Sequence, residues 1–352
     1  MARALTCALA LTLGFAAAAG FAPRSASAEP HSRLRIASFQ TELARKGPGL
    51  LLDAIRKGDA QSRAVAALIA KAAPDIIALQ GIDYDHRAAA LTALAQQIEA
   101  AGHAMPYHFA LRPNSGLATG LDMDGDGRLG TARDAQGYGQ YSGHGGMALL
   151  SRYPILQDQA RDFSALLWAD MPDPMIPMRG GVPFPSAQAF AAQRLSSTGH
   201  WAVPLRLDSG AVITLLSFAA TPPVFDGPQD RNGKRNHDEL RFWTWMMEGA
   251  FGPAPEEPFV LLGLANIDPV HGEGRRGALR ALLADPRLTD PRPRGPSGDD
   301  ATAEFATAGP LRLSYILPSA SWTVTGSGQH ADPEASRHRL IFVDLALPPP
   351  AP

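Results

Sequence analysis

The chain has 352 residues, with 32 Lys and Arg against 34 Asp and Glu, and 45% of its residues are hydrophobic. This length is enough for one large core or two modest ones. Lys and Arg form no run, which argues against capture of a nucleic-acid backbone by a broad basic surface but leaves open a small phosphorylated substrate. The only cysteine is Cys7, so a chain that loses its first residues has no disulfide, Cys-ligated zinc or Cys nucleophile.

Residues 1–28 have the features of a secretory signal peptide. A basic start at Arg3 precedes an apolar stretch and the small-residue site Ala26-Ser27-Ala28. Cleavage after Ala28 predicts an exported protein, periplasmic or secreted, whose 30 basic and 34 acidic residues give a net charge of −4. An uncleaved anchor is the alternative, but the apolar run is short and interrupted by glycines. No later segment is apolar enough to predict a membrane span.

Short apolar, β-branched runs alternate with segments of helical period along the rest of the chain. In the first half of the chain we predict strands at Leu34–Phe39, Asp75–Leu79, Tyr107–Leu111 and Gly146–Arg152, and helices at Ser62–Ala73 and Arg87–Ala101. In the second half we predict a hairpin of Trp201–Leu207 and Ala211–Ser217, helices at Asn236–Glu248 and Gly277–Leu283, and strands at Phe259–Ala265, Leu311–Leu317, Trp322–Thr325 and Leu340–Leu345. A capping box of Asn236 and Glu239 is expected to open the helix at Asn236–Glu248.

This order of elements predicts an α/β fold in which two packed mixed β-sheets are flanked by helices, a four-layer sandwich. The sequence has no internal repeat and no clear linker, so residues 29–347 are expected to form a single domain, with 348–352 as a disordered tail. Three long irregular stretches, Gly116–Gly145, Met171–Pro185 and Pro291–Ala308, are expected to be functional or mobile loops.

Five short motifs occur where these strands end or begin. They are IASFQ (Ile36–Gln40), IIALQG (Ile76–Gly81), VLLGLANIDP (Val260–Pro269), LRLSYILPS (Leu311–Ser319) and SRHRLIFVDL (Ser336–Leu345). In this order the motifs resemble the endonuclease/exonuclease/phosphatase superfamily of metal-dependent phosphoesterases. The resemblance implies the four-layer fold, phosphoester hydrolysis, and magnesium or manganese at the site.

Several motif positions differ from what the resemblance implies. The family has Asn at Gln40, Glu at Gly81, His at Phe218, and Asp at Leu264, Ser314 and Arg337. In the family the carboxylates hold the cation and an Asp–His pair handles protons. The remaining catalytic candidates are His338, which is the best remaining acid/base candidate, Asn266 and Asp268, and Gln40 and Asn266 remain to bind phosphate.

Each remaining candidate also has a structural interpretation. Asn266 and Asp268 are residue types that cap turns, such as the one before Pro269. His338 alternatively precedes an edge strand and faces solvent. Asp83 and Asp85 are the nearest carboxylates that could replace the lost metal ligands, but they equally suit the N-terminus of the following helix.

The segment LDMDGDGRLG matches the first half of a calcium loop. Asp122, Asp124 and Asp126 alternate and Gly127 follows them, as in loops of the EF-hand type. A full loop would place a bidentate Glu at Arg133, and Asp134 is one residue late. We expect calcium in residues 122–134, where it would order the long loop; the alternative is a solvated acidic turn.

A second polar segment, Thr221–Glu239, is expected at the mouth of the site. Arg231 and Arg235 are candidate phosphate ligands because a guanidinium binds phosphate in a bidentate manner. The alternative is a long turn that bonds to its own backbone.

Two hypotheses for the function follow. In the first, an exported hydrolase cleaves phosphoesters with a cation held by Asp83, Asp85 or Asp268. In the second, a catalytically silent relative binds an anionic ligand through Gln40, Asn266, Arg337 and His338. The partner would be a phosphorylated small molecule, a lipid headgroup or a nucleic acid. A third, weaker idea is a calcium-ordered interaction protein.

Overall fold

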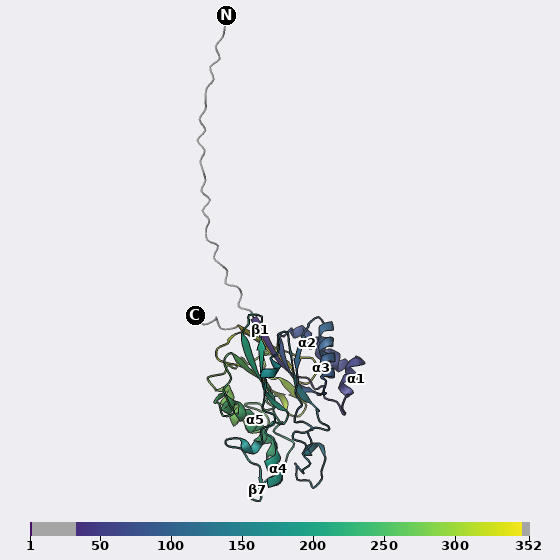
Figure 1. The fold of residues 1–352 in the computed structure, drawn as a ribbon, viewed down its shortest axis with the longest axis vertical. Helices are drawn as coiled ribbons and strands as arrows, with labels where there is room; N and C mark the ends of the chain where they lie inside the picture. Colours follow the sequence, from purple (N-terminus) through teal and green to yellow (C-terminus); the bar gives the residue numbers. More distant parts are fainter. Residues whose placement is uncertain (2–32, 347–352) are drawn as a thin grey trace. The chain divides into compact units, whose positions relative to one another are not determined.

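Two mixed β-sheets form the centre of the computed structural model, which describes residues 33–346 and Met1 (Figure 1). The predicted signal peptide and C-terminal tail lie outside the described residues. The first sheet contains, in spatial order, β14 (Thr323–His330), β15 (Leu340–Ala346), β1 (Arg33–Gln40), β2 (Ile76–Ile82), β4 (Gly146–Ser151) and β3 (Tyr107–Phe109). The second contains β13 (Ser314–Pro318), β10 (Phe259–Leu264), β9 (Val212–Ala219), β8 (Gly199–Arg206) and β5 (Arg161–Asp162).

Helices cover the outer face of each sheet. The helices are α1 (Leu50–Arg56), α2 (Ala60–Ala72), α3 (Ala89–Ala100), α4 (Ala187–Ala192), α5 (Arg231–Met247) and α6 (Gly277–Leu283). Apolar residues of α1, α2 and α3 form one core with the first sheet, and those of α5 and α6 form another with the second sheet. A third core lies between the sheets. The predicted four-layer α/β sandwich is therefore confirmed.

The burial of β2 explains its continuous apolar sequence. Ile76 and Ala78 belong to the core between the sheets, whereas Ile77 and Leu79 belong to the core under the helices. Successive side chains of a strand point to opposite faces, so a strand covered on both faces needs apolar residues at every position. Polar residues of such strands are consequently confined to the strand ends.

The start of α5 differs from the prediction. The helix begins at Arg231, after Asp230 in a left-handed conformation, and not at Asn236. Asn236 lies inside the helix and is fully buried; its Nδ2 donates to the carbonyls of Thr221 and Ala265, 2.7 Å away in each case. The predicted capping box of Asn236 and Glu239 is therefore wrong, because both side chains bond to neighbouring segments.

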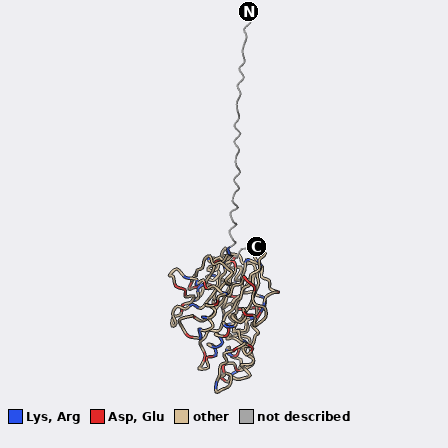
Figure 2. Tube along the Cα trace, turned by 90° about the vertical axis from the view of Figure 1, so that its left-hand side faces the viewer, with Lys and Arg blue, Asp and Glu red and all other residues tan. Residues whose placement is uncertain are grey.

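Two of the predicted irregular stretches contain small hairpins. β6 (Met178–Arg179) pairs with β7 (Val182–Pro183), and β11 (Ala303–Phe305) pairs with β12 (Gly309–Leu311). Lys and Arg are interspersed with Asp and Glu along the trace (Figure 2). Within residues 33–346, no helix combines the length and the apolar character that a membrane crossing requires.

At Gly263 of β10 the backbone of the neighbouring strand β9 approaches very closely. It has a φ of 152°, and a Cβ placed there would overlap the carbonyl oxygen of Phe218 on β9. We expect Gly263→Ala to lower the free energy of unfolding by at least about 3 kcal/mol, because backbone must move to admit the methyl group. Gly210→Ala is the control: its φ is 85° but nothing lies near the new Cβ, so it should cost about 1–2 kcal/mol. Equal losses in urea denaturation would contradict this account.

Candidate functional site at the strand ends

The predicted site positions lie at strand termini of the two sheets. Gln40 ends β1 and pairs in parallel register with Gln80 of β2, which places Gly81 beside it. Leu264 ends β10 and pairs with Ser314, the first residue of β13. β1 contacts both β10 and β13 across the interface between the sheets.

A path of hydrogen bonds connects these strand ends. Ser336 Oγ donates to the carbonyl of Gln40 over 2.9 Å and accepts from His338 N over 3.1 Å. Ala303 forms an isolated antiparallel β-bridge with His338. The preceding residue, Thr302, accepts with its Oγ1 from Ser314 N over 3.0 Å. The structure therefore brings Gln40, His338 and Ser314 to one region, as the motifs predicted.

The side chain of Gln40 lies across Gly81. A Cβ at Gly81 would collide with Gln40 Oε1 and would lie 2.9 Å from its Cδ. Gly81 also has a φ of 67°, a conformation that side chains disfavour. The longer amide at position 40 therefore fills the space into which a side chain at position 81 would extend.

The second sheet contributes apolar and uncharged groups to this region. Leu264 is 4% exposed, and Ser314 is 1% exposed with an Oγ that has no hydrogen-bond partner among the described residues. Phe218 points to the opposite face, where it packs against Trp243 and the buried His200. Burial lowers the pKa of His200 to about 4, which keeps this aromatic cluster uncharged at neutral pH.

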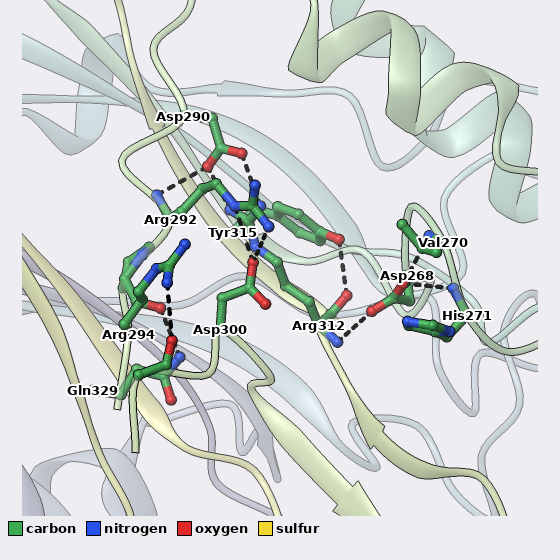
Figure 3. Close-up of polar contacts among 12 residues, drawn as sticks. Asp268, Val270, His271, Asp290, Arg292, Arg294, Asp300, Arg312, Tyr315 and Gln329 are labelled. Carbon is green, nitrogen blue, oxygen red and sulfur yellow. Dashed lines mark hydrogen bonds and ion pairs between the residues drawn. The ribbon is translucent and has the colours of Figure 1, made fainter. Parts of the chain in front are cut away.

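Asn266 and Asp268 follow β10 and bond to backbone groups. Asn266 is in a left-handed conformation, and its Nδ2 donates to the carbonyl after β9 over 2.7 Å. Asp268 Oδ1 accepts from Val270 N and His271 N, and its Oδ2 accepts from Arg312 N over 2.7 Å (Figure 3). These bonds correspond to the turn-capping alternative, and they occupy both oxygens of the Asp268 carboxylate.

Arg312 fixes the loop Pro291–Ala308 against β13. Its buried guanidinium bonds to Asp290 with both terminal nitrogens, one at 2.8 Å, and lies 4.5 Å from the centre of the Tyr315 ring (Figure 3). Such bidentate, charge-assisted contacts are among the strongest in proteins. The loop is thereby held next to the strand ends.

Glu42 occupies the corner where β1 and β15 meet. Its Oε2 accepts from Ser336 Oγ and Arg337 N, each over 2.9 Å, and its Oε1 accepts from Arg337 Nε over 2.9 Å. Burial opposes ionisation, but the Arg337 and Ser336 contacts outweigh it and lower the pKa of Glu42. Sequence reasoning missed Glu42, although it lies only two residues after the Gln40 motif.

His338 is 5% exposed and carries no charge at neutral pH. Burial lowers its pKa to about 4; Glu42 opposes this shift, and the neighbouring Arg337 adds to it. His338 Nδ1 has no hydrogen-bond partner among the described residues. The imidazole therefore lacks the carboxylate partner that would orient a general base.

Asp83 and Asp85 bind backbone N–H groups. Asp83 accepts from Arg45 N over 2.8 Å and from Gly145 N over 2.9 Å. Asp85 accepts from Ala89 N and Ala90 N at the start of α3, which matches the helix-terminus alternative. The structure does not bring these two carboxylates into a cluster with Asp268.

Arg235 is buried within the protein, and Arg231 is partly buried. Arg231 donates to the carbonyl of Met123 and to Gln193 Oε1. Arg235 donates to four carbonyls at 2.6–3.0 Å, those of Gln136, Arg194, Leu195 and Ser196. Burial lowers the pKa of Arg235 to about 10. These guanidinium groups tie loops to α5 and are not at a site mouth.

The acidic loop is compact. Asp122, Asp124 and Asp126 place one carboxylate oxygen each within 4.8 Å of the others. Asp122 accepts from Gly125 N and Gly127 N, so the loop turns around this side chain. Burial, followed by the charges of neighbouring carboxylates, raises the pKa of Asp124.

The strand ends do not fit the divalent cation that the family generally uses. Magnesium and manganese sites need carboxylate oxygens. In the part of the chain that the structure describes, only the acidic loop brings three potential ligands close enough for an ion. Gln40, Gly81, Leu264 and Ser314 contribute no anionic oxygen.

The chain matches the model of the endonuclease/exonuclease/phosphatase family over residues 49–338. It therefore belongs to this family. No curated protein matches it in sequence.

Solved structures with the same fold have low sequence identity to the chain. An endonuclease/exonuclease/phosphatase from Beutenbergia cavernae has 16% identity and a TM-score of 0.58, covering 90% of this chain and 72% of that one. Sphingomyelinase C from Streptomyces griseocarneus has 15% identity and a TM-score of 0.51, covering 89% and 99%. The human Nocturnin catalytic domain, with bound sulfate, has 13% identity and a TM-score of 0.50, covering 90% and 94%.

The packing of Gln40 on Gly81 predicts an energetic coupling. Gly81→Glu should destabilise the protein by about 1–2 kcal/mol from backbone strain and by about 1 kcal/mol more for moving the flexible end of Gln40. Adding Gln40→Asn, which shortens the obstructing side chain, should recover the second part. Gly102→Glu, which has a positive φ but no neighbour near its Cβ, should show the strain alone. Additive effects of the changes at positions 40 and 81 in urea denaturation would refute the coupling.

Proposed function

We propose that this member of the family binds a ligand at its strand ends without hydrolysing it. The proposal rests on one observation: Gln40 fills the space above Gly81. A carboxylate at position 81 is thus missing, and the flexible end of Gln40 would have to move to admit one. Leu264 ends β10 and Ser314 lies opposite it. The four strand-end positions 40, 81, 264 and 314 therefore offer hydrogen-bonding groups but no anionic group.

The acid/base group also favours binding over hydrolysis. Phosphoester hydrolysis needs a cation for the phosphoryl oxygens, an oriented base and a donor to the leaving oxygen. His338 is the one acid/base candidate that lies in this region, and it adjoins Arg337 in place of a carboxylate. Glu42 is engaged with Arg337 and bonds to Ser336, not to the imidazole.

A hydrolase with a rebuilt metal site is the alternative. The family and the named sphingomyelinase among similar structures make phosphoester cleavage the ancestral expectation. Asp83, Asp85 and Asp268 are the carboxylates available for such a site. Because each accepts two or more backbone hydrogen bonds, rebuilding would require these turns to open.

The protein acts outside the cytoplasm in this proposal. The basic start, the apolar stretch and the Ala26-Ser27-Ala28 site support export. The absence of cysteine after Cys7 is compatible with an oxidising compartment.

Hydrolysis assays separate the two functions. The purified protein should not cleave a generic phosphodiester or phosphomonoester above the background of an Asn266→Ala/His338→Ala double variant. Magnesium, manganese, calcium and chelator should give the same result, because the strand ends supply no anionic ligand. A metal-dependent phosphodiesterase in the same assay is the positive control. Metal-dependent turnover that the double variant loses would overturn the proposal.

The acidic loop is proposed to bind calcium as a structural ion. Its three carboxylates and the glycine after them match the start of a calcium loop. Arg231, which donates to the carbonyl of Met123, connects the loop to α5. Calcium would offset the repulsion that raises the pKa of Asp124.

Calcium should raise the melting temperature by several degrees at concentrations well above its Kd, because it binds only the folded loop. Asp124→Asn should be as stable as the wild type, or more stable, in chelator, since it removes a repelling charge. The same variant should lose most of the calcium response. Asp158→Asn, an exposed acid outside the loop, is the control and should respond as the wild type does. An unchanged calcium response in Asp124→Asn would refute the site.

A further inference from the structure

A groove of about 480 Å³ lies beside the strand ends, at the start of β15. Its polar lining comes from four segments that are distant in sequence: Ser297, Glu304, Gln329, Asp332, Ser336 and His338. A volume of this size suits a ligand of one or two small rings. The groove is thus the recess that adjoins the connected strand ends.

The charges around the groove do not favour an anion. Its two arginines are each paired with a carboxylate, Arg337 with Glu42 and Arg339 with Asp299, the latter over 2.6 Å. The two lining carboxylates, Glu304 and Asp332, form no ion pair with any residue of the 33–346 segment. A phosphate would therefore meet two carboxylates and no uncompensated cation.

Buried uncharged groups lie behind this rim. His338 lines the groove and is 5% exposed, yet its Nδ1 has no hydrogen-bond partner in the described chain. Of the unpaired buried atoms near the strand ends, this Nδ1 belongs to a residue that lines the groove, whereas Gln40 Oε1 and Ser314 Oγ do not. A buried polar atom without a partner is costly and rare, so the unpaired Nδ1 of a groove-lining histidine points to a ligand.

A hydroxyl group matches both sets of observations. It can donate to a carboxylate or an amide oxygen and accept from an imidazole N–H, whereas an ammonium ion can only donate.

We propose that this groove binds an uncharged, hydroxyl-rich ligand, a sugar or polyol, with Glu304 and Asp332 accepting from its hydroxyls at the rim and His338 meeting it at the deep end. This assignment rests on the proposed non-hydrolytic function and specifies its ligand. It replaces the phosphorylated partner that the motifs led us to expect.

Saturation-transfer NMR on the purified full-length protein tests the assignment. The neutral probes are glucose, galactose, mannose, maltose, cellobiose and myo-inositol. The charged probes are inorganic phosphate, myo-inositol hexakisphosphate and choline. At least one neutral probe should bind, and the phosphates and choline should bind more weakly or not at all.

Variants locate the site. The Glu304 side chain is exposed and forms no hydrogen bond or ion pair within the described residues. Glu304→Ala should therefore weaken binding of the neutral probe about ten-fold, the effect of one lost hydrogen bond to a charged group. His338→Ala should also weaken it. His108→Ala, at the opposite edge of the first sheet, is the matched control and should leave it unchanged. Glu304→Ala also serves as the safeguard if His338→Ala fails to fold.

Each result has a defined meaning. Preferential binding of phosphates or of choline, binding of no probe, or neutral binding unaffected by Glu304→Ala would overturn the ligand assignment and leave the non-hydrolytic function standing. Metal-dependent phosphoester turnover in the parallel assay would overturn the proposed function itself.

Discussion

The central constraint on this protein is that both sheets are covered on both faces. The facing sides pack against each other and the outer sides pack against helices, so most side chains of the inner strands are apolar, and the few polar ones, such as Ser38, His200 and Asp344, are buried. The polar groups of the candidate site accordingly lie at the strand ends and in the loops that follow them. This explains why its motifs are short and separated in the sequence.

The substitutions at the strand ends compensate one another. Gln40 fills the space that Gly81 leaves, and Glu42 neutralises the cation that Arg337 introduces. Leu264 joins the core between the sheets. Beside these contacts, Gln40 Oε1, Ser314 Oγ and His338 Nδ1 remain without hydrogen-bond partners among the described residues.

Local patterns predicted the fold well because the elements are strongly apolar and regular. The strands predicted at Leu34–Phe39 and Asp75–Leu79, the helix predicted at Ser62–Ala73 and the hairpin of 201–217 lie within a few residues of the observed bounds, whereas α1 was not predicted. The start of α5 was wrong because a polar segment from Asn232 to Glu239 looks like a turn, and only tertiary contacts reveal that it is buried. The same limit hid Glu42 and the burial of Arg231 and Arg235. Their partners are distant in sequence, and no local spacing records them.

The turn-forming residues, in contrast, form hydrogen bonds that their local sequence preferences favour. For Asp85 and Asp268, the hydrogen bonds follow the local preference of aspartate to accept backbone N–H groups. Sequence alone weighed this preference against metal binding but could not decide, because a carboxylate suits both. The backbone geometry of the surrounding turn carries the missing information.

Arg235 has a consequence for how the protein moves. One side chain of α5 binds carbonyls from two segments that are distant in sequence and also bond to each other, around Gln136 and across Arg194–Ser196. Neither segment can lift away from the helix without exposing a buried guanidinium and stranding the carbonyls of the other. These parts of the chain should consequently open together or not at all, so amide protons in both loops would exchange with solvent at a common, slow rate despite their lack of regular structure.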